Sequence, residues 1–311
     1  MRNILILMWL SALVLSAAPL ARFEAVEPHM GTLVQIRLYA RGAVAAQRAF
    51  ENAFRRVREL DEKLSDYRPE SELMRLCRAK AGTAVAVSGD LWRVLDQSQE
   101  IAQATNGAFD VAMGPLIALW REARKAARLP DASAIEEARR RSGYSYLHMD
   151  RGKRTVTLLR EGMLLDLGGI AKGYAASEAV RVLRESGVPR ALVAVSGDIA
   201  VGDPPPHREG WIIQAGKSTC TLRNAAVSTS GDAEQFVEID GVRYSHIVDP
   251  VTGLGLRNSE EVSVTAPNGD IADALATACS VRACTPELLA RFRARQLSPD
   301  VGASNPAGGK Y

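Results

Sequence analysis

The sequence predicts an α+β fold in which mixed or antiparallel sheets are flanked by helices. Helix-like and strand-like segments are interspersed along the 311 residues without strict βαβ alternation, which disfavours a parallel α/β sheet. No internal repeat is present, and an apolar content of 47% is ordinary for a globular protein with a substantial core. We therefore expect one α+β domain, spanning residues 22–285.

The N-terminus has the pattern of a secretory signal peptide, predicted over residues 1–21. A charged start at Met1-Arg2-Asn3 precedes an almost unbroken apolar run from Ile4 to Leu15, and Pro19-Leu20-Ala21 offers small residues for cleavage. This run is short for a transmembrane span. We expect export to the periplasm, with an uncleaved membrane anchor as the alternative. No cysteine follows the run, so no lipid attachment is expected.

Charge and cysteine content restrict the classes of partner and site. The formal net charge is only +3 and no basic run is interleaved with aromatic residues, so nucleic acid is not a favoured partner. The four cysteines include no C-x-x-C pair, which disfavours a zinc site or a redox dithiol, although export would permit disulfides. Cys279 lies in an apolar helical stretch and is expected to be a small core residue.

The first half of the chain is predicted to be rich in helix. Thr32–Ala40 alternates polar and apolar residues as a half-buried strand does, and Ala43–Leu64 carries an apolar stripe at helical spacing. Further expected segments are a helix from its N-cap Ser88 to Ala104, a charged connector over 121–129 and a short surface helix over Ala132–Arg141.

The second half is predicted to consist mainly of strands. Gly, Asp and Pro residues separate short runs of apolar and β-branched residues. One helix is expected to begin at Ala171 and to stop at Gly187, and another to open at Asp270. The expected strands are Tyr146–Met149, Thr155–Leu159, Met163–Leu167, Ala191–Val195, Trp211–Ala215, Ala225–Thr229, Phe236–Ile239, Tyr244–Val248 and Glu261–Ala266.

The segment Leu164–Ala175 is the most informative for a ligand site. Asp166 is expected at the end of a strand, and Gly168-Gly169 then allows a tight turn into a helix, whose unpaired N–H groups suit an anion such as a phosphate. Lys172 in the first turn opposes the helix dipole, which indicates a bound anion nearby. The alternatives are a lysine in solvent or a pair with Asp166. The segment matches neither G-x-G-x-x-G nor a P-loop.

The helix that opens at Asp270 carries two oxygen ligands on an alanine-rich background. Asp273 and Thr277 are four residues apart and share one face. Hard oxygen ligands of this kind bind Mg²⁺, which takes few protein ligands when substrate phosphates supply others. The alternative is structural, with Asp273 interacting with the helix dipole and Thr277 bonding back to the backbone.

Two further side chains are candidates for chemistry or binding. His246 stands at the end of a predicted strand and can act as a general base, with Asp249 orienting its ring. The alternative is a structural histidine, with Asp249 only starting the turn. Tyr67, in the turn after the first long helix, either stacks on a flat ligand or closes the helix end.

The motifs together resemble the FAD:protein FMN transferases, the ApbE-type flavin transferases. The resemblance extends from about Met30 to Val281, and its specificity comes from seven blocks in the family's order. These blocks are Met30-Gly31-Thr32, Ser65-Asp66-Tyr67, Gly107-Ala108-Phe109-Asp110-Val111, the stretch from Asp166 to Ala175, Ser230-Gly231-Asp232, the stretch from Tyr244 to Gly253, and the stretch from Ala272 to Ala278.

The resemblance implies an ApbE-like fold with an FAD and Mg²⁺ site between its lobes. It implies a metal held by Asp273, Thr277 and the backbone carbonyl of Gly169, and catalytic roles for His246 and Asp273. The residues that it implies as FAD contacts are Met30, Tyr67, Ala108, Phe109, Asp110, Asp166, Lys172 and Ile247.

The reaction implied by the resemblance is the Mg²⁺-dependent transfer of FMN from FAD to a threonine or serine of an acceptor protein, with release of AMP. The implied acceptor is an exported electron-transport subunit with an Asp-Gly-x-Thr-like motif, part of a membrane complex, so association with the inner-membrane surface is compatible with it. Two alternatives need the same pocket. One is a Mg²⁺-dependent FAD pyrophosphatase giving FMN and AMP, and the other is an exported flavin-binding protein without turnover.

The sequence departs from the family's pattern at both ends. Many members carry a lipobox cysteine, which is missing here, so a soluble exported protein is expected. The end of the chain, from Arg282 to Tyr311, differs from the usual closing segment, and residues 286–311 are predicted to be an atypical tail. Within it, Ser298–Lys310 is rich in Pro, Gly and Ser, a composition typical of disordered segments.

Overall fold

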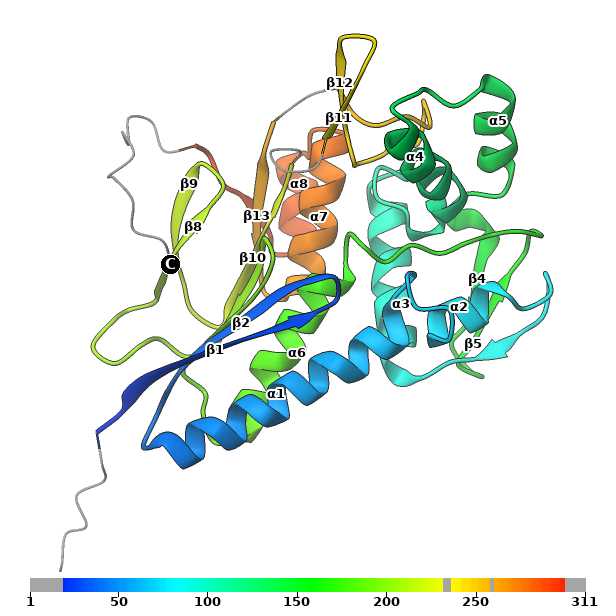
Figure 1. Ribbon diagram of the computed structural model, residues 1–311. Coiled ribbons are helices and arrows are strands. Elements are labelled where there is room, and N and C mark those ends of the chain that lie inside the picture. Colours follow the sequence, from blue (N-terminus) through cyan, green and yellow to red (C-terminus); the bar gives the residue numbers. More distant parts are fainter. Residues whose placement is uncertain (1–18, 232–235, 258–259, 300–311) are drawn as a thin grey trace, which may run out of the picture.

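The computed structural model describes residues 19–231, 236–257 and 260–299, and its largest element is a seven-stranded sheet (Figure 1). Every neighbouring pair of strands is antiparallel. In spatial order the strands are β1 (Ala21–His29), β2 (Thr32–Ala40), β6 (Ala191–Val195), β7 (Asp198–Val201), β10 (Ala225–Ser230), β13 (Val262–Ala266) and β14 (Arg295–Gln296). The sheet therefore has the beginning of the described chain at one edge and its end at the other.

Three helices cover one face of this sheet, namely α1 (Ala43–Leu64), α6 (Ala171–Glu185) and α7 (Gly269–Val281) (Figure 1). Small residues such as Ala49 and Ala179 are fully buried between the helices and the sheet, which allows the backbones to approach closely. The closest approach joins α6 to α7, because a Cβ atom on Gly173 would lie 2.0 Å from the carbonyl oxygen of Gly269. Only glycine fits at this crossing.

The opposite face of the sheet is covered by a hairpin of β8 (Trp211–Ala215) and β9 (Ser218–Leu222). Both strands alternate buried and exposed residues, so each presents one apolar side. Their inward side chains, including Trp211 and Ile213, pack against Val227 of the sheet. The large sheet is thus buried on both faces.

A second group of elements lies beside this layered unit, to the right in Figure 1. Its main core joins α2 and α3 to α7 and α8 through the segment 163–175. A separate core joins α4 and α5 to the β11–β12 hairpin. The elements are α2 (Glu72–Cys77), α3 (Gly89–Ala104), α4 (Gly114–Ala126), α5 (Ala132–Arg140), α8 (Pro286–Arg291), the 3₁₀ turns η1 (Val111–Met113) and η2 (Tyr144–Tyr146), a sheet of β3 (Val85–Ala86), β5 (Thr155–Leu158) and β4 (Leu147–Asp150), and the hairpin of β11 (Phe236–Ile239) and β12 (Val242–Ser245).

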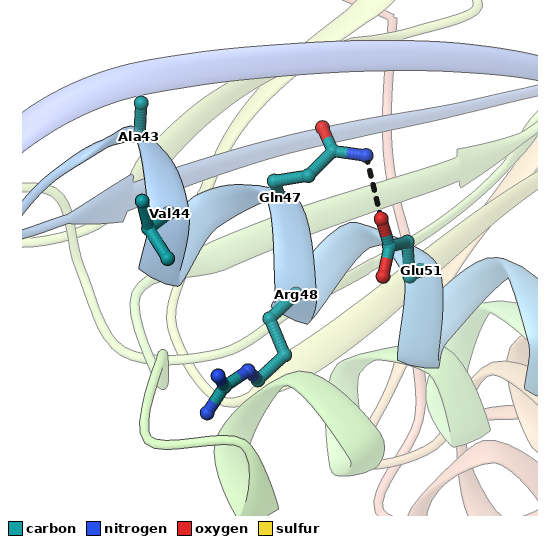
Figure 2. A pocket seen from close by; sticks show the side chains of 5 residues that line it. All are labelled: Ala43, Val44, Gln47, Arg48 and Glu51. Atoms are coloured by element: carbon teal, nitrogen blue, oxygen red, sulfur yellow. Dashed lines mark hydrogen bonds between the residues drawn. The ribbon is translucent and has the colours of Figure 1, made fainter.

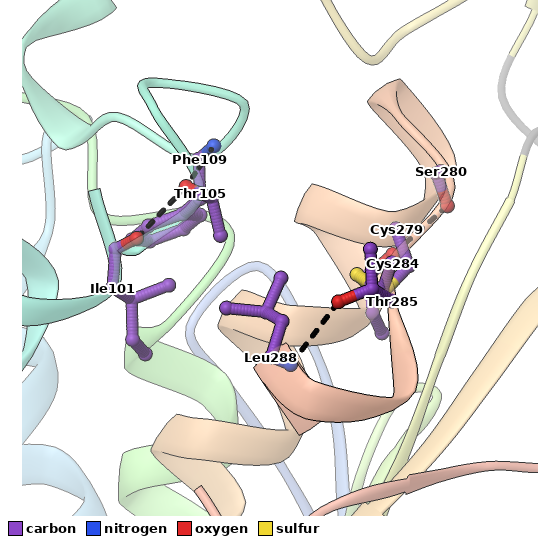
Figure 3. The surroundings of a disulfide bond; sticks show 9 residues. Ile101, Thr105, Phe109, Cys279, Ser280, Cys284, Thr285 and Leu288 are labelled. Atoms are coloured by element: carbon purple, nitrogen blue, oxygen red, sulfur yellow. Dashed lines mark hydrogen bonds between the residues drawn. A yellow bond between two sulfur atoms is a disulfide. The ribbon is translucent and has the colours of Figure 1, made fainter. Parts of the chain in front are cut away.

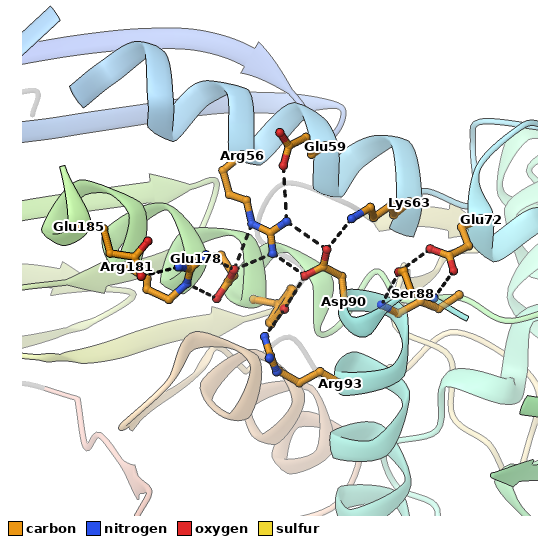
Figure 4. A network of polar contacts seen from close by, with 12 residues as sticks. Arg56, Glu59, Lys63, Glu72, Ser88, Asp90, Arg93, Glu178, Arg181 and Glu185 are labelled. Atoms are coloured by element: carbon orange, nitrogen blue, oxygen red, sulfur yellow. Dashed lines mark hydrogen bonds and ion pairs between the residues drawn. The ribbon is translucent and has the colours of Figure 1, made fainter. Parts of the chain in front are cut away.

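A polar network ties the two groups together (Figure 4). The guanidinium of Arg56 on α1 donates to Asp90 on α3 and to Glu178 on α6, and the Tyr174 hydroxyl donates to Asp90 at 3.0 Å. Burial alone would raise the pKa of Asp90, but hydrogen bonds from Arg56 and Lys63 hold it well below its usual range. The network fixes α6, and with it the start of that helix, relative to α1 and α3.

Several expected element boundaries were wrong. Met163–Leu167 is not a strand, and its Asp166 N–H donates to the Val111 carbonyl oxygen of η1 at 2.8 Å. The expected connector over 121–129 is largely the second half of α4. Asn268, not Asp270, is the N-cap of α7. Elements that the sequence reading omitted include β1, β7, β9, α2, α8 and β14.

The two ends of the chain also differ from expectation where they are described. Strand β1 begins at Ala21, the last residue of the predicted signal peptide, and α8 and β14 lie inside the predicted tail. Residues 1–18 of the predicted signal peptide, residues 300–311 of the predicted tail and Asp232 lie outside the described residues. Within the described ranges, no helix combines the length and apolarity needed to cross a membrane.

Cys279 is buried, as expected, but it is also bonded to Cys284 (Figure 3). Helix α7 ends at Val281, and the chain then turns back so that the two Cα atoms lie 5.0 Å apart. The expectation of a small core residue is confirmed, and the disulfide is an addition to it. The sequence indicated that disulfides were permitted but not which cysteines would pair.

Candidate functional site

Lys172, at the second position of α6, is the centre of a cluster of oxygen atoms. Its Nζ atom donates to the carbonyl oxygen of Gly168 at 2.6 Å and lies 3.3 Å from Asp198 Oδ2 and 3.7 Å from Asp273 Oδ2. Both carboxylates are buried. The lysine therefore neither points into solvent nor pairs with Asp166. Two aspartates from neighbouring elements supply the negative charge that offsets the unfavourable interaction of Lys172 with the helix dipole.

Asp273 is positioned by the crossing of α6 and α7. Its Oδ2 atom accepts the Gly173 N–H at 3.2 Å, so the carboxylate is bound to the first turn of α6. Burial and the nearby charge of Asp198 together raise the pKa of Asp273 to about 7, against the opposing effect of Lys172. Asp273 is the fifth residue of α7, beyond the first turn in which an acid mainly interacts with the helix dipole.

The backbone of Gly169 faces Thr277 and Phe109. A Cβ atom on Gly169 would lie 3.0 Å from Thr277 Oγ1 and 3.3 Å from Phe109 Cε2. The structure thus brings together the two segments that carry the predicted metal ligands, since Gly169 meets Thr277 and the neighbouring Gly173 meets Asp273.

The donor set of this cluster fits a small divalent cation. Carboxylate and carbonyl oxygens surround the ammonium of Lys172, and the Thr277 hydroxyl lies beside Gly169. These are the oxygen ligands that Mg²⁺ prefers. No group of three or more His, Cys, Asp or Glu side chains with metal-site geometry occurs in the described part of the chain. A metal here would therefore take few protein side chains and would complete its shell with other oxygen ligands.

Asp166 belongs to a second charged group, next to the first. Its Oδ1 atom accepts the Gly168 N–H at 2.8 Å, and its Oδ2 atom accepts a hydrogen bond from Arg121 of α4 at 2.6 Å. Burial raises the pKa of Asp166, and the charge of Asp66 on the other side of Arg121 adds to that shift. The arginine guanidinium lies 4.6 Å from the ring centroid of Tyr67.

Tyr67 is 75% exposed, so it does not close the end of α1 by burial. Arg121 stacks against it, and Arg124 lies one turn further along α4. Arg124 Nε is a buried side-chain nitrogen without a hydrogen-bond partner among the described residues, and burial lowers the pKa of this arginine. An exposed aromatic ring beside an unsatisfied cation is an arrangement that suits a flat, anionic ligand.

The remaining predicted FAD contacts on the N-terminal side lie in turns. Met30 forms the β1–β2 turn with φ of 52° and packs against both major cores. Ala108 and Phe109 are buried just after α3. The Asp110 carboxylate accepts the N–H groups of Ala112 and Tyr144, both at 2.7 Å, and so fastens η1 to η2. Burial raises the pKa of Asp110 to about 6.

His246 and Ile247 lie in the loop that follows β12. The Trp120 indole of α4 donates to the Ser245 carbonyl oxygen at 2.9 Å, which fastens this loop to α4. Within the loop, the Ser245 hydroxyl accepts the Ile247 N–H at 3.1 Å. The half-buried His246 is therefore held by the helix that also carries Arg121. The Asp249 carboxylate accepts the Val251 N–H at 2.8 Å, as expected for a residue that starts a turn.

Hollows on the surface occur away from these residues. Figure 2 shows one along the first turns of α1, lined by Ala43, Val44, Gln47, Arg48 and Glu51. Another lies between α3 and β4 and is lined by residues such as Gln99 and His148. No predicted site residue lines either hollow, so the chemistry of the side chains, not surface shape, identifies the site.

Three charged residues of the two groups were absent from the sequence prediction, namely Asp198, Arg121 and Arg124. Asp198 follows a two-residue turn, Ser196-Gly197, between two apolar runs, which is a hairpin signal that would have placed it at a strand end. The two arginines fell within the segment taken as a connector. No local pattern distinguishes them from solvated helix charges.

Comparison with known proteins gives a consistent assignment. Residues 30–295 match the model of the ApbE family. A Treponema pallidum relative named FAD:protein FMN transferase is 35% identical over 292 residues, covering 85% of this chain and 80% of the relative. A Klebsiella pneumoniae relative of the same name is 30% identical over 252 residues, covering 78% of each.

Solved structures agree with the sequence relatives. The ApbE protein of Thermotoga maritima has a TM-score of 0.78 at 28% identity, covering 88% of this chain and 91% of that one. The flavin transferase ApbE from Vibrio cholerae has a TM-score of 0.78 at 27% identity, covering 89% and 93%. Fold and relatives define an enzyme of the flavin transferase class. The chain belongs to the ApbE family, which confirms the resemblance and the α+β fold.

Proposed function

We propose that this enzyme is an FAD:protein FMN transferase that requires Mg²⁺, attaches FMN to a threonine or serine hydroxyl of an acceptor protein and releases AMP. The observation that carries the proposal is the cluster at the start of α6, where the half-buried Lys172, two buried carboxylates and the Gly168 carbonyl gather. A helix N-terminus together with a lysine is a site for phosphate oxygens. The names of the curated relatives support the same reaction.

The binding roles follow from the chemistry of each side chain. Lys172 binds the diphosphate of FAD, and Tyr67 stacks on a flat part of the molecule with Arg121 behind the ring. The other FAD contacts in the proposal are Met30, Ala108, Phe109, Asp110, Asp166 and Ile247. The Gly169 carbonyl, Asp273 and Thr277 would hold Mg²⁺, which when bound neutralises charge on the diphosphate and on the departing phosphate.

The transfer step breaks the diphosphate and makes a phosphoester. The acceptor hydroxyl oxygen bonds to the phosphorus of the FMN half, and the bond from this phosphorus to the bridging oxygen breaks so that AMP leaves. His246 accepts the hydroxyl proton, which an unactivated alcohol would not lose at neutral pH. The half-buried loop that holds His246 is fixed by Trp120, which keeps the base in place.

The proposal includes the compartment and the partner. The signal-like N-terminus supports export to the periplasm, and the Cys279–Cys284 disulfide supports an oxidising compartment. An acceptor in the same compartment would be an electron-transport protein of a membrane complex. The enzyme would then work at the surface of the inner membrane.

The experiment that tests the function uses the enzyme, FAD, Mg²⁺ and an acceptor domain with an Asp-Gly-x-Thr-like motif. We expect a flavin-sized mass increase on the acceptor and an equal amount of AMP by chromatography. The same incubation without acceptor distinguishes the alternatives. FMN and AMP formed equally well in both would indicate a pyrophosphatase, and unchanged FAD in both would indicate a binding protein.

A further inference from the structure

We propose that Asp198 is a positioning residue of this site, which holds the Lys172 ammonium when Asp273 is engaged by a divalent cation. The inference rests on the proposed function, because it assigns Lys172 to the FAD diphosphate and Asp273 to the metal. In this arrangement one lysine is shared by two acids. Asp198 is the acid that keeps the lysine in place when the other acid is occupied.

The sheet fixes Asp198 more firmly than a loop would. It is the first residue of β7, it is 4% exposed, and it stands opposite Ser228 in the register of β7 and β10. The Ser228 hydroxyl donates to its Oδ1 atom. The other oxygen, Oδ2, faces Lys172 at 3.3 Å. One oxygen therefore anchors the carboxylate to the sheet, and the other holds the ammonium.

The two acids bind Lys172 from different elements. The ammonium is closer to Asp198 on the sheet (3.3 Å) than to Asp273 on α7 (3.7 Å). A divalent cation bound by Asp273 would repel an ammonium at this distance. With Asp198 present, the lysine keeps a buried counter-charge and remains at the start of α6. Without it, Lys172 would depend on Asp273 alone and would compete with the metal for that carboxylate.

The test measures metal and FAD binding without any turnover. Mg²⁺ binding is followed by calorimetry on the folded apoprotein, and FAD binding by the change in flavin fluorescence. We expect Asp198→Asn, which keeps an oxygen for the Ser228 hydroxyl, to weaken Mg²⁺ binding by about tenfold or more, as removal of a close opposite charge does for proton affinities. FAD binding in the presence of Mg²⁺ should weaken as well, because Lys172 is no longer held.

A double variant separates positioning from a general loss of charge. In the Asp198→Asn background, Lys172→Met removes the competing ammonium. We therefore expect Mg²⁺ affinity to return to within a few-fold of wild type while FAD affinity stays low. Asp198→Asn with unchanged affinities for Mg²⁺ and FAD would overturn the proposal. A double variant that binds Mg²⁺ as weakly as Asp198→Asn alone would also overturn it.

A matched control changes the same charge elsewhere. Asp203→Asn removes a partly exposed carboxylate that pairs with Arg184, twelve residues and about 18 Å along α6 from Lys172. It should leave both affinities unchanged, and thermal unfolding verifies that every variant is folded. The readouts also separate this proposal from the proposed function. A wild-type enzyme that forms no flavin adduct would contradict the function, whereas the effects on Mg²⁺ binding stand or fall independently of any acceptor.

Discussion

At the residue scale, the site depends on a few buried charged groups, and backbone contacts position the residues around them. Lys172, Asp198 and Asp273 come from three elements, yet a carboxylate oxygen of each aspartate lies within 3.7 Å of the Lys172 Nζ atom. Burial makes each of these interactions stronger than it would be in water. Single substitutions here should therefore change binding and turnover much more than they change overall shape.

Replacement of Asp273 by alanine should abolish Mg²⁺-dependent turnover. It removes the single charged side chain among the three proposed metal ligands, and the Gly173 N–H loses its acceptor as well. FAD binding should weaken less, because stacking and backbone contacts remain. Transfer rates measured against Mg²⁺ concentration test this expectation. A variant with the wild-type rate and the same Mg²⁺ dependence would show that Asp273 has only a structural role.

Replacement of His246 by alanine should lower the transfer rate by about 10²–10⁴-fold, the usual contribution of a general base. FAD affinity should stay nearly the same, because the loop remains fastened to α4 through Ser245 and Trp120. In the wild type, transfer should decline at acidic pH, since a protonated ring accepts no proton. Single-turnover rates across pH test both points. If the variant retains the wild-type rate and acid limb, another group, such as Asp273, is the base.

Asp110 should make the stability of the protein depend on pH. Its folded pKa of about 6 is above its ordinary value of 3.8, so the protonated form favours the folded state, and this contribution is lost as pH rises from about 4 to about 6. The free energy of unfolding of the wild type, relative to Asp110→Asn, should therefore fall by about 1–3 kcal/mol between pH 4 and pH 7. Urea unfolding at both pH values measures it. A constant difference would mean that Asp110 has the same pKa in the folded and unfolded states.

At the scale of elements, α7 links the site to the end of the described chain. Asp273 and Thr277 lie on this helix, and its last turn is bonded through Cys279 to Cys284, just before α8 (Figure 3). Phe109, which meets Gly169, is among the residues around the disulfide. The crosslink therefore supports the same helix that presents the proposed metal ligands.

Reduction of this disulfide should destabilise the protein by about 2 kcal/mol, the value expected from the chain entropy of so short a loop. Thermal unfolding with and without a thiol reductant should show a shift of several degrees. The variant Cys279→Ala, Cys284→Ala is the control, because its unfolding should not respond to reductant. An equal response in this variant would assign the effect to something other than the disulfide.

At the scale of the whole molecule, the end of the described chain completes both the sheet and a core. Strand β14 pairs with β13, and Leu289 and Phe292 are buried in the main core. The family match ends at residue 295, close to the same point. The predicted tail boundary at residue 285 thus cuts through a packed part of the fold.

Replacement of Phe292 by alanine should lower the free energy of unfolding by about 3–5 kcal/mol, as for other large-to-small changes in cores. Phe292 is 6% exposed, whereas Arg295, three residues on, is exposed in β14. Arg295→Ala serves as the control and should change stability by less than about 0.5 kcal/mol. Urea unfolding of both variants decides the question. Equal effects would mean that this segment contributes little to the core.

The sequence predicted elements well where one periodic pattern decides the structure. Helix α1 has the predicted bounds, Ala43–Leu64, because its apolar stripe is long and unambiguous. Strand β2 was predicted for the same reason. Strand β7 was missed because it has only four residues, although the Ser196-Gly197 turn joins it to its neighbour β6 in a hairpin. The apolar run Met163–Leu167 predicts a strand that the structure does not contain, because an apolar pattern does not specify hydrogen-bond partners.

The candidate site was predicted in its motifs but not in its pairings. Lys172, Asp273 and Thr277 were recognised, since each lies in a distinctive stretch. The pairing of Lys172 with Asp198 could not be derived from the sequence, because it depends on the order of the strands in the sheet. The contact of Asp166 with Arg121 likewise depends on how α4 packs.

The crossing of α6 and α7 has a practical consequence for protein engineering. A Cβ atom on Gly173 would lie 2.0 Å from the Gly269 carbonyl oxygen, and one on Gly269 would lie 2.1 Å from the Gly173 carbonyl oxygen. The separation of Lys172 from Asp273 is therefore dictated by two main chains in contact, not by the size of any side chain. A designer who wished to graft this lysine–aspartate pair onto another helical scaffold would have to transplant both glycines with it.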